Sequence, residues 1–528
     1  MLVNQFLERS AERLPDKTAL VCEGARLSYR EIDAMANRVA HGLIGSGVQP
    51  GDRVVIFLDN GPEAVVAIFG ALKASAVFSV VNPTTKTDKL RYMLQSLRPS
   101  ALITHVNKLG VAAEACKGAT ALSHILLVGG DAHNLPNTGA RIASWDTWMS
   151  LQPATRPPAR SIDVDLASIV FTSGSTGNPK GVMCEHRNMV SVAGAIASYL
   201  ENVESDVVLN VLQLAASYGL YQVLVAFMVG ATVVMERSFA FPYQVIALMQ
   251  REGVTGFAAV PTIYSMLLSL KDLAKHPIPT LRYLTNAGAG LPERRALQLH
   301  AAFPESKLYL MYGQTECVRV CYLAPEEVAR RPGSVGKAIP NTEIFIVDEL
   351  DQAVGPGVVG ELVVRGSHVM RGYWEEPEKT AARFRSARRH DGQGIGLPGE
   401  TLLFTNDLFR MDEEGYLYFE SRTDDIIKSR GEKVAPREVE HVLYNFEGVR
   451  DAVAVGVPDD VLGEAIKVCV VPHDGITLDP RALREYCRRN LEDFMMPKYV
   501  EIWPELPKGA TGKVDRKAIA AGLVPELT

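Results

Sequence analysis

A glycine- and hydroxyl-rich segment with one lysine has the residue types best suited to phosphate chemistry. It runs Phe171-Thr-Ser-Gly-Ser-Thr-Gly-Asn-Pro-Lys-Gly181 and follows Ala167-Ser-Ile-Val170, which is predicted to form a short buried strand. Glycines let backbone N–H groups approach an anion, hydroxyls add donors, and Lys180 adds positive charge. The spacing excludes a Walker loop, because Pro179 stands where that motif needs glycine. The segment predicts a loop that holds phosphate oxygens, with a solvated turn as the alternative.

A second candidate segment is Tyr312-Gly-Gln-Thr-Glu316, which follows a predicted strand at Lys307–Met311. A strand that ends in a glycine turn, with a hydroxyl and a carboxylate, is suited to positioning a nucleotide. Glu316 offers a hard oxygen ligand of the kind that Mg²⁺ prefers. An ordinary helix start is the alternative interpretation of the Thr-Glu pair.

Two further segments carry charged side chains in turns. Asp407, in Phe404-Thr-Asn-Asp-Leu408, is suited to accepting hydrogen bonds from two ribose hydroxyls, with Arg422 beside it. Lys513 stands in the glycine-bearing stretch Pro507-Lys-Gly-Ala-Thr-Gly-Lys513 near the C-terminus, where a mobile domain would deliver it. A surface ion pair and a solvated lysine are the alternatives for these two segments.

The length and composition indicate a globular protein of more than one domain. The 528 residues exceed the size at which single hydrophobic cores stop growing. The chain is 47% hydrophobic and 22% charged with a net charge of −6, which gives no support for nucleic-acid binding. The apolar stretches Ala64–Val81 and Gly219–Val234 are interrupted by Lys73 and Gln222 and are predicted to be core, not membrane spans.

The seven cysteines are dispersed along the chain, at positions 22, 116, 184, 317, 321, 469 and 487. An odd, scattered set is typical of reduced thiols in a cytoplasmic protein, and no histidine near Cys317 and Cys321 completes a zinc site. The N-terminal residues lack a basic region followed by an apolar core, so no signal peptide is expected.

The elements that must position these segments alternate between helical and strand patterns, which favours an α/β fold with a largely parallel sheet. Residues 333–420 instead hold short β-like runs and predict a small β-rich subdomain, and Arg385–Glu400 is predicted to be a mobile loop. The α/β pattern restarts near residue 424. The predicted elements are helices at Tyr29–Ser46, Glu63–Lys73, Glu438–Tyr444 and Arg481–Arg489, and strands at Arg53–Leu58, Val77–Val81, Glu343–Val347, Gly360–Arg365, Tyr416–Glu420, Ala452–Val457 and Lys467–Val471.

In this order, the segments resemble the motifs of the adenylate-forming superfamily, which includes acyl- and aryl-CoA synthetases, carrier-protein adenylation domains and firefly luciferase. The resemblance runs nearly the full length. It extends to Asn286-Ala-Gly-Ala-Gly-Leu-Pro292, Pro332-Gly-Ser-Val-Gly336, Gly372-Tyr-Trp374 and Lys428-Ser-Arg-Gly-Glu-Lys-Val434. Members make an acyl adenylate from a carboxylic acid and ATP, release pyrophosphate and usually transfer the acyl group to a thiol. The resemblance thus implies ATP, Mg²⁺ and coenzyme A as cofactors.

The family pattern also implies an architecture. Residues 1–423 would form a large N-terminal domain of stacked α/β layers that binds ATP and the acid, and residues 424–528 a small mobile C-terminal domain. The small domain would rotate between half-reactions about a hinge at Asp424. Rotation would withdraw Lys513 and bring Lys428 toward the site, where Gly431 gives a pantetheine arm close backbone passage.

The resemblance assigns roles residue by residue. Lys513 would bridge the carboxylate and the α-phosphate, Thr315 would contact the α-phosphate, and Glu316 would bind magnesium. The cofactor-binding positions are Thr172, Ser173, Gly174, Ser175, Thr176, Gly177 and Lys180 for the β- and γ-phosphates, with Thr176 also at the metal; Ala287, Gly288, Ala289, Tyr312 and Gly313 around the adenine; and Asp407 and Arg422 at the ribose.

Two departures from the family pattern keep the charged residue. Thr405-Asn-Asp407 replaces the usual Thr-Gly-Asp, and Ser421-Arg422 replaces Gly-Arg. More informative is Leu212–Tyr221, where amino-acid-activating relatives carry an aspartate for the substrate amine. No carboxylate stands in this segment, which favours an acyl chain or an aryl acid. The predicted substrate pocket consists of Ala216, Ser217, Tyr218, Val260, Val318 and Arg319, and Arg319 is either in an ion pair or a partner for a polar or anionic substrate tail.

Three functions follow from the resemblance. The first is an acyl-CoA synthetase for fatty acids or a related aryl acid, favoured because the thiol-approach motif around Gly431 is present. The second is a fatty-acyl-AMP ligase that loads an acyl carrier protein. The third is a non-catalytic adenylate-binding protein, against which Lys513, Glu316 and the phosphate loop argue.

Overall fold

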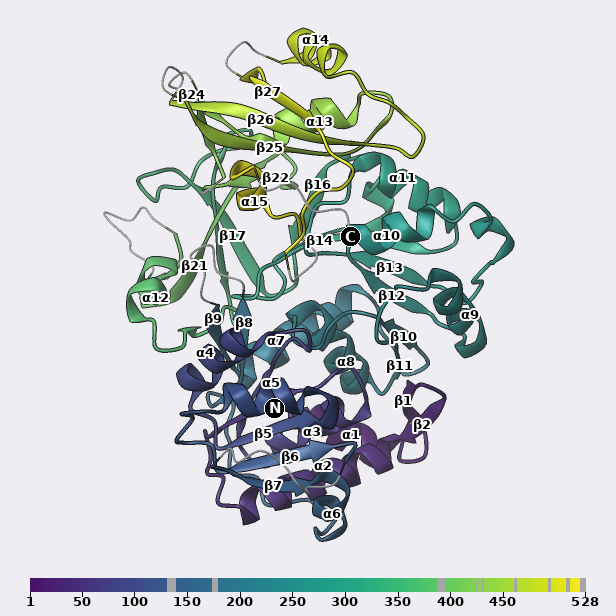
Figure 1. Cartoon of the computed structure of the whole chain (residues 1–528), viewed down its shortest axis with the longest axis vertical. Coiled ribbons are helices and arrows are strands. Elements are labelled where there is room, and N and C mark those ends of the chain that lie inside the picture. The colour runs from purple at the N-terminus through teal and green to yellow at the C-terminus, as the bar shows by residue number, and fades with distance from the viewer. Residues whose placement is uncertain are drawn as a thin grey trace.

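The computed structural model describes residues 1–130, 139–172, 179–386, 395–397, 399–423, 425–429, 432–459, 463–491, 495–509 and 513–522 (Figure 1). A large N-terminal part carries two extended sheets, and a smaller C-terminal part lies over one end of it (Figure 1).

An eight-stranded sheet holds the N-terminal residues, in the strand order β19-β9-β8-β4-β3-β5-β6-β7. The six strands from β8 to β7 are parallel, and β9 and β19 add antiparallel pairs at one edge. Continuous apolar runs suit parallel strands that are covered on both faces. The bounds are β3 (Arg53–Phe57), β4 (Val77–Val80), β5 (Ala101–His105), β6 (His124–Val128), β7 (Arg141–Ser144), β8 (Leu166–Thr172), β9 (Lys180–Glu185) and β19 (Gly372–Tyr373).

A second, longer sheet has the order β17-β18-β21-β22-β16-β15-β14-β13-β12-β10-β11-β1-β2, with β20 paired to β21. Its central strands from β14 to β1 are parallel, and the strands from β15 to β17 are antiparallel. The bounds are β1 (Thr18–Cys22), β2 (Ala25–Ser28), β10 (Val207–Asn210), β11 (Thr232–Met235), β12 (Gly256–Ala259), β13 (Tyr283–Asn286), β14 (Lys307–Tyr312), β15 (Cys321–Leu323), β16 (Ser334–Ala338), β17 (Thr342–Val347), β18 (Gly360–Gly366), β20 (Phe384–Ser386), β21 (Thr401–Met411) and β22 (Leu417–Arg422).

Helices of the N-terminal part join the two sheets into one core. Phe227 of α8 packs against Phe69 of α3 and Tyr29 of α2, with ring centres 5.4 and 5.3 Å apart, and the largest cluster of buried apolar side chains draws on both sheets. The bounds are α1 (Asn4–Arg13), α2 (Tyr29–Gly45), α3 (Pro62–Lys73), α4 (Thr87–Leu97), α5 (Leu109–Ala115), α6 (Trp145–Ser150), α7 (His186–Tyr199), α8 (Ser217–Val229), α9 (Pro242–Glu252), α10 (Pro261–Leu268), α11 (Glu293–Ala302) and α12 (Pro377–Arg383), with the short helices η1 (Val106–Lys108), η2 (Leu273–Lys275) and η3 (Pro325–Glu327).

The C-terminal part has its own sheet, in the order β24-β23-β26-β25 with β27 beside β26. Two clusters of buried apolar side chains lie wholly within residues 427–520, which makes this part a small domain. The bounds are β23 (Ile427–Ser429), β24 (Glu432–Val434), α13 (Pro436–Tyr444), β25 (Val449–Asp459), β26 (Gly463–Pro472), α14 (Pro480–Asn490), β27 (Tyr499–Ile502) and α15 (Arg516–Ala520). The boundary between residues 423 and 424 stays a prediction, since residue 424 lies outside the described residues.

The predicted α/β fold with a large and a small domain is confirmed, and each predicted helix and strand overlaps an observed one. The β-rich region exists, but hydrogen bonding through β14, β15, β16 and β22 makes it continuous with the parallel strands. Most of the predicted loop at Arg385–Glu400 lies outside the described residues. Its two ends are anchored, because Arg385 is paired with Asp351 and Glu400 with Arg365.

Both apolar stretches of the sequence contribute to the core. They correspond to α3 with β4 and to α8 with β11. Among the described residues, no helix has both the length and the apolar character that a membrane crossing requires. All seven cysteines are buried and carry free thiols.

Candidate active site

The candidate nucleotide residues leave the sheet at one edge. β12, β13 and β14 are adjacent and parallel, with Ala259 opposite Asn286 and Asn286 opposite Leu310. The residues after these strands therefore emerge together at their carboxyl ends, where open α/β sheets bind ligands. Val260 follows β12, Ala287–Ala289 follows β13, and Tyr312 ends β14 with Gly313 after it. A Cβ added to Gly288 would lie 3.5 Å from Val260, so these segments are in contact.

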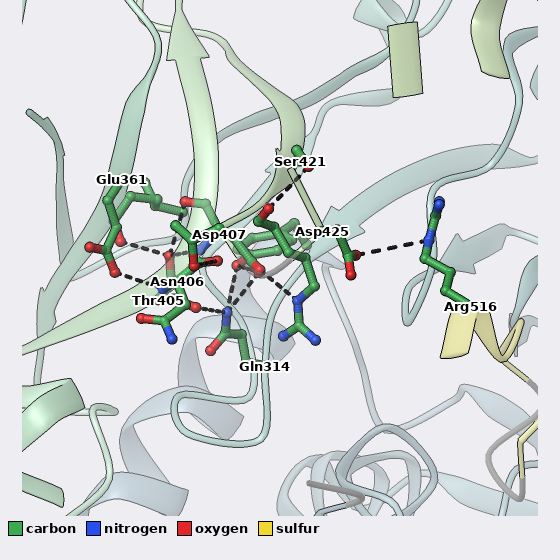
Figure 2. A network of polar contacts seen from close by, with 12 residues as sticks. Gln314, Glu361, Thr405, Asn406, Asp407, Ser421, Asp425 and Arg516 are labelled. Atoms are coloured by element: carbon green, nitrogen blue, oxygen red, sulfur yellow. Dashed lines mark hydrogen bonds and ion pairs between the residues drawn. The ribbon is translucent and has the colours of Figure 1, made fainter. Parts of the chain in front are cut away.

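Asp407 is the centre of a polar network at this edge, which Figure 2 shows together with Gln314 and the turn at Thr405 and Asn406. Asp407 is 4% exposed, and its carboxylate accepts hydrogen bonds from the Tyr312 hydroxyl at 2.5 Å and from the Gln314 amide at 2.7 Å. The Nε of Arg422 donates to the other carboxylate oxygen at 2.9 Å. The structure thus brings together the two residues predicted to hold the ribose.

The electrostatics of this network favour charged Arg422 and neutral Tyr312. Burial acts against the charge of Arg422, but the carboxylate of Asp407 raises its pKa above the ordinary value. Burial raises the pKa of Tyr312, and Asp407 raises it further. The Tyr312 phenol therefore remains a hydrogen-bond donor, and the Asp407 oxygen that accepts only from Arg422 keeps a lone pair for a further donor.

Asn406 accounts for one departure from the family pattern. Its backbone has φ = +52°, a left-handed conformation that glycine adopts readily and that asparagine tolerates better than other residues. Its N–H donates to a carboxylate oxygen of Glu361 at 2.7 Å (Figure 2). Its C=O accepts from the N–H of Thr423. Asparagine therefore keeps the turn that presents Asp407.

Glu316 is held by an aromatic residue from the other sheet. The Tyr373 hydroxyl donates to Glu316 at 2.5 Å, and Glu316 is 8% exposed. The ammonium of Lys180 lies 5.4 Å from the centre of the Tyr373 ring, because β19 pairs with β9. Burial and the neighbouring Glu316 raise the pKa of Tyr373, so the phenol stays protonated. Tyr373 therefore lies between the carboxylate of Glu316, to which its hydroxyl donates, and the ammonium of Lys180, which lies near its ring.

The phosphate loop is described only at its two ends. Thr172 and Lys180 lie opposite each other where β8 and β9 pair, so the two ends of this segment are adjacent. The predicted ligands Ser173, Gly174, Ser175, Thr176 and Gly177 lie outside the described residues. Their proposed contacts stay predictions.

Lys513 reaches this edge from the small domain. Its C=O accepts from the N–H of Gly509 at 2.8 Å, and the neighbouring residues Lys508 and Val514 form an antiparallel bridge. The side chain is accessible to solvent, yet surrounding protein lowers its pKa by desolvation, and the charge of Arg422 lowers it further. Asp407 and Glu316 act in the opposite direction. The ammonium therefore lies within electrostatic range of both candidate carboxylates.

Part of the contact between the domains is made by Arg437 of α13. Its guanidinium donates to the C=O of Phe419 in β22 and lies 5.5 Å from the centre of the Phe419 ring. A Cβ added to Gly290 would lie 3.7 Å from the same guanidinium. In Figure 1 the small domain accordingly lies over the end of the large domain that carries β22.

The thiol-approach residues are placed only in part. Lys428 belongs to β23, which pairs with β24, but its side chain lies outside the described residues. Gly431 and the proposed hinge Asp424 also lie outside them. No geometry is assigned to these three positions.

The pocket residues lie near the start of α8 and after β14. Ala216 directly precedes α8, Ser217 begins it, and the Tyr218 hydroxyl donates to the C=O of Thr285 in β13 at 2.8 Å. The guanidinium of Arg319 lies 5.3 Å from the centre of the Tyr218 ring. Val318 is 7% exposed. Tyr218, Val318 and Arg319 are thus gathered in one place, next to the strand that leads to the adenine segment.

Three residues of the site were not identified from the sequence. Gln314 and Tyr373 lie within quoted motifs, but local pattern does not predict their hydrogen bonds to Asp407 and Glu316. Arg383 of α12 donates to the Gln314 amide oxygen at 2.9 Å and to the C=O of Thr405 at 2.8 Å, so it orients Gln314. No sequence signal points to Arg383.

Comparison with known proteins defines the class of protein. Residues 7–374 match the AMP-binding enzyme family, and residues 438–513 match the AMP-binding enzyme C-terminal domain. The chain therefore belongs to the AMP-binding enzyme family of the adenylate-forming superfamily, as its motifs predict.

Particular relatives cover the chain from end to end. A long-chain-fatty-acid–CoA ligase of Bacillus subtilis (strain 168) is 31% identical over 98% of this chain and 94% of its own. The structure of ATP-bound MatB from Rhodopseudomonas palustris superposes with a TM-score of 0.87 at 27% identity, covering 99% of both chains. The anthranilate CoA ligase AuaEII in complex with anthranoyl-AMP gives a TM-score of 0.88 at 27% identity, covering 99% of this chain and 97% of that one.

Proposed function

We propose that this protein activates a carboxylic acid with ATP and then forms a thioester with coenzyme A. In the first step a carboxylate oxygen attacks the α-phosphorus, and pyrophosphate leaves from an acyl adenylate. In the second step the thiol sulfur attacks the acyl carbon, and AMP leaves. The observation that carries the proposal is the buried carboxylate of Asp407, paired with Arg422 at 2.9 Å and hydrogen-bonded by Tyr312 of β14, at the sheet edge where a nucleotide is expected to bind.

The charges at the site suit the first step. Two anions, a carboxylate and a triphosphate, must meet, so catalysis requires positive charge at the α-phosphate and a fixed direction of attack. Lys513 and Lys180 supply the charge, Thr315 a hydroxyl, and Asp407 the acceptor for the ribose hydroxyls. ATP in the MatB structure and anthranoyl-AMP in AuaEII support this assignment.

Magnesium fits the site through Glu316. Among the described residues no group of three or more histidine, cysteine or acidic side chains could hold a metal ion. Mg²⁺ at phosphate-transfer sites uses one or two carboxylates with substrate phosphates, so a single protein carboxylate is sufficient. Glu316, with one oxygen held by Tyr373, and Thr176 of the phosphate loop would hold it. Bound Mg²⁺ would neutralise negative charge on the phosphates.

The acid is proposed to be an acyl-chain or aryl acid. The segment Leu212–Tyr221 carries no carboxylate for an α-amine. The fatty-acid and anthranilate ligases among the relatives support both remaining classes, and their common acceptor supports coenzyme A. A phosphopantetheine arm on a carrier protein has the same thiol chemistry and is the alternative acceptor.

The test is pyrophosphate release from ATP against fatty and aryl acids, with and without coenzyme A, with the product mass determined. Turnover that needs coenzyme A and yields acyl-CoA is expected. Enzyme-bound acyl-AMP without an acyl-CoA product would favour a carrier protein, and not coenzyme A, as the thiol acceptor. Absence of pyrophosphate release with every acid would contradict catalysis and favour a non-catalytic adenylate-binding protein.

A further inference from the structure

Arg319 is a buried cation without a carboxylate partner. It is 4% exposed, and its Nε has no hydrogen-bond partner. Among the described residues, no aspartate or glutamate forms an ion pair with it. Its side-chain neighbours are aromatic: the guanidinium lies 5.3 Å from the centre of the Tyr218 ring, and its charge acts on the nearby Tyr199 phenol. The ion pair that the sequence also allowed is therefore absent from the described structure.

The groups around Arg319 do not supply the missing negative charge. Burial raises the pKa of Tyr199 to about 12, and burial also raises the pKa values of Tyr218 and Cys321. Phenols and thiols with such pKa values are neutral at physiological pH. The arginine, by contrast, does not lose its proton in proteins. A buried charge that lacks a counter-charge destabilises the fold, so its presence calls for a functional explanation.

A strained turn directs Arg319 to the interior. Val318 has φ = +62°, and the N–H of Arg319 donates to the C=O of Cys317 at 2.7 Å, which closes a tight γ-turn around Val318. A β-branched residue rarely adopts this conformation. The turn also requires glycine at position 313, where a Cβ would lie 2.1 Å from the C=O of Val318. Strain of this kind is typical of functional sites.

Arg319 also has a defined place relative to the proposed chemistry. It lies four residues after Thr315, the proposed contact of the α-phosphate, and stacks with Tyr218, whose hydroxyl is fixed to Thr285. Tyr218 itself directly follows Ala216 and Ser217 of the proposed acid pocket. The guanidinium therefore lies against Tyr218, one of the residues that the family pattern assigns to the acid pocket.

We propose that the acid substrate carries a second carboxylate, distant from the one that is activated, and that Arg319 pairs with it. This inference rests on the proposed acid activation and names its substrate class. A guanidinium presents several N–H donors in a plane that matches a carboxylate. The second carboxylate supplies the counter-charge that the groups around Arg319 lack. A simple fatty acid, in contrast, leaves the arginine unpaired.

The experiment compares matched pairs of acids in the pyrophosphate-release assay: succinic with butanoic, glutaric with pentanoic, adipic with hexanoic, and suberic with octanoic acid. The wild-type protein is expected to show a higher kcat/KM for at least one diacid than for its monoacid partner. In Arg319→Met the ratio of kcat/KM for the diacid to kcat/KM for its matched monoacid is expected to fall about a hundredfold, as for loss of one partner from a buried charge pair. Arg319→Lys keeps the charge without the planar donors and is expected to be intermediate.

Arg282 provides a matched control. It also stacks on a tyrosine, with 4.8 Å to the centre of the Tyr283 ring, but it is paired with Asp206 at 2.7 Å. Arg282→Met should lower the melting temperature and leave the diacid-to-monoacid ratio unchanged. Arg319→Met should not lower the melting temperature, because it removes an unpaired buried charge. The preferred diacid should raise the melting temperature of the wild type but not that of Arg319→Met.

The outcomes separate the two proposals. Activation of monoacids alone, with the ratio unaffected by Arg319→Met, overturns the role of Arg319 and leaves acid activation intact. Absence of pyrophosphate release with all acids, including the fatty and aryl acids above, overturns acid activation and this inference with it. If Arg319→Met does not fold, two other measurements test the role of Arg319. A wild-type preference for a diacid over its matched monoacid, reduced in Arg319→Lys, supports the role, and absence of either result contradicts it.

Discussion

Tyr373 lies in β19 of one sheet, Glu316 lies in the turn after β14 of the other sheet, and a 2.5 Å hydrogen bond joins them. The same ring lies 5.4 Å from the ammonium of Lys180. Tyr373 therefore connects Glu316, the proposed magnesium ligand, to β9, the strand that follows the predicted phosphate loop. Because the residues are 57 positions apart in sequence, the fold and not a local motif creates this relationship.

Tyr373→Phe tests this coupling. Removal of the hydroxyl leaves the ring near Lys180 but frees the carboxylate of Glu316 to rotate. We expect pyrophosphate release to slow about tenfold, the value of one hydrogen bond to a charged group, and the half-saturating Mg²⁺ concentration to rise. Titration of Mg²⁺ against the rate measures both effects. A variant with wild-type rate and Mg²⁺ dependence would show that the hydrogen bond has no role in adenylation.

Lys513→Ala removes the charge proposed for the α-phosphate. We expect the rate of adenylate formation to fall on the order of 10²–10³-fold, as for other single groups that stabilise a transition-state charge. Hydrolysis of separately supplied acyl-AMP, or its conversion by coenzyme A, should be affected much less. Single-turnover measurements of each half-reaction distinguish the two, and equal loss in both would contradict the assignment.

The lowered pKa of Lys513 predicts a pH dependence. A lysine loses its charge as pH rises through its pKa, so the alkaline decline of kcat/KM should occur at lower pH than for an ordinary lysine. In Lys513→Arg the group stays charged, and the remaining activity should lack that decline. pH–rate profiles of the two proteins provide the comparison, and superimposable alkaline limbs would show that another group titrates.

Asn406 offers a test of backbone conformation. Asn406→Gly should keep activity and change the free energy of unfolding little, because glycine adopts φ = +52° without strain. Asn406→Val should destabilise the protein by about 1–2 kcal/mol or displace Asp407, because a β-branched side chain is unfavourable there. Denaturant unfolding and the KM for ATP measure the two effects. Equal behaviour of both variants would contradict the role of the turn.

Asp424→Pro addresses the proposed hinge. Proline fixes its own φ and restricts the preceding residue, so it should hinder rotation of the small domain. We expect adenylate formation to be spared and thioester formation to be impaired. Rapid-quench assays of each half-reaction provide the measurement, and an equal loss of both would remove the basis for a hinge at this residue.

The sequence predicts the order and type of the elements well, because hydrophobic periodicity and turn residues are local properties. The strand predicted at Arg53–Leu58 is observed at Arg53–Phe57, and the helix predicted at Tyr29–Ser46 at Tyr29–Gly45. Pairing between distant strands is not local. The sequence therefore separated a β-rich subdomain that the structure joins to the parallel strands through β15 and β16.

The candidate site shows the same difference between local motifs, which the sequence predicts, and contacts between distant residues, which it does not predict. Motif order indicated Asp407, Arg422, Glu316 and Lys513, but not the residues that orient them. Gln314 reaches Asp407 across 93 positions, and Arg383 reaches Gln314 across 69, with no pattern that connects them. Asn406 differs from the family pattern yet keeps the turn, because its backbone conformation suits glycine and asparagine alike. The roles assigned to the phosphate loop, Asp424 and Gly431 stay predictions.

Activation of an acid through an acyl adenylate is tested most directly with an acid whose carboxylate carries ¹⁸O. Attack of that carboxylate on the α-phosphorus, followed by transfer of the acyl group to coenzyme A, leaves one labelled oxygen in AMP. We expect AMP with a single ¹⁸O and unlabelled pyrophosphate. Label in pyrophosphate or in inorganic phosphate, or AMP formed without label, would contradict it.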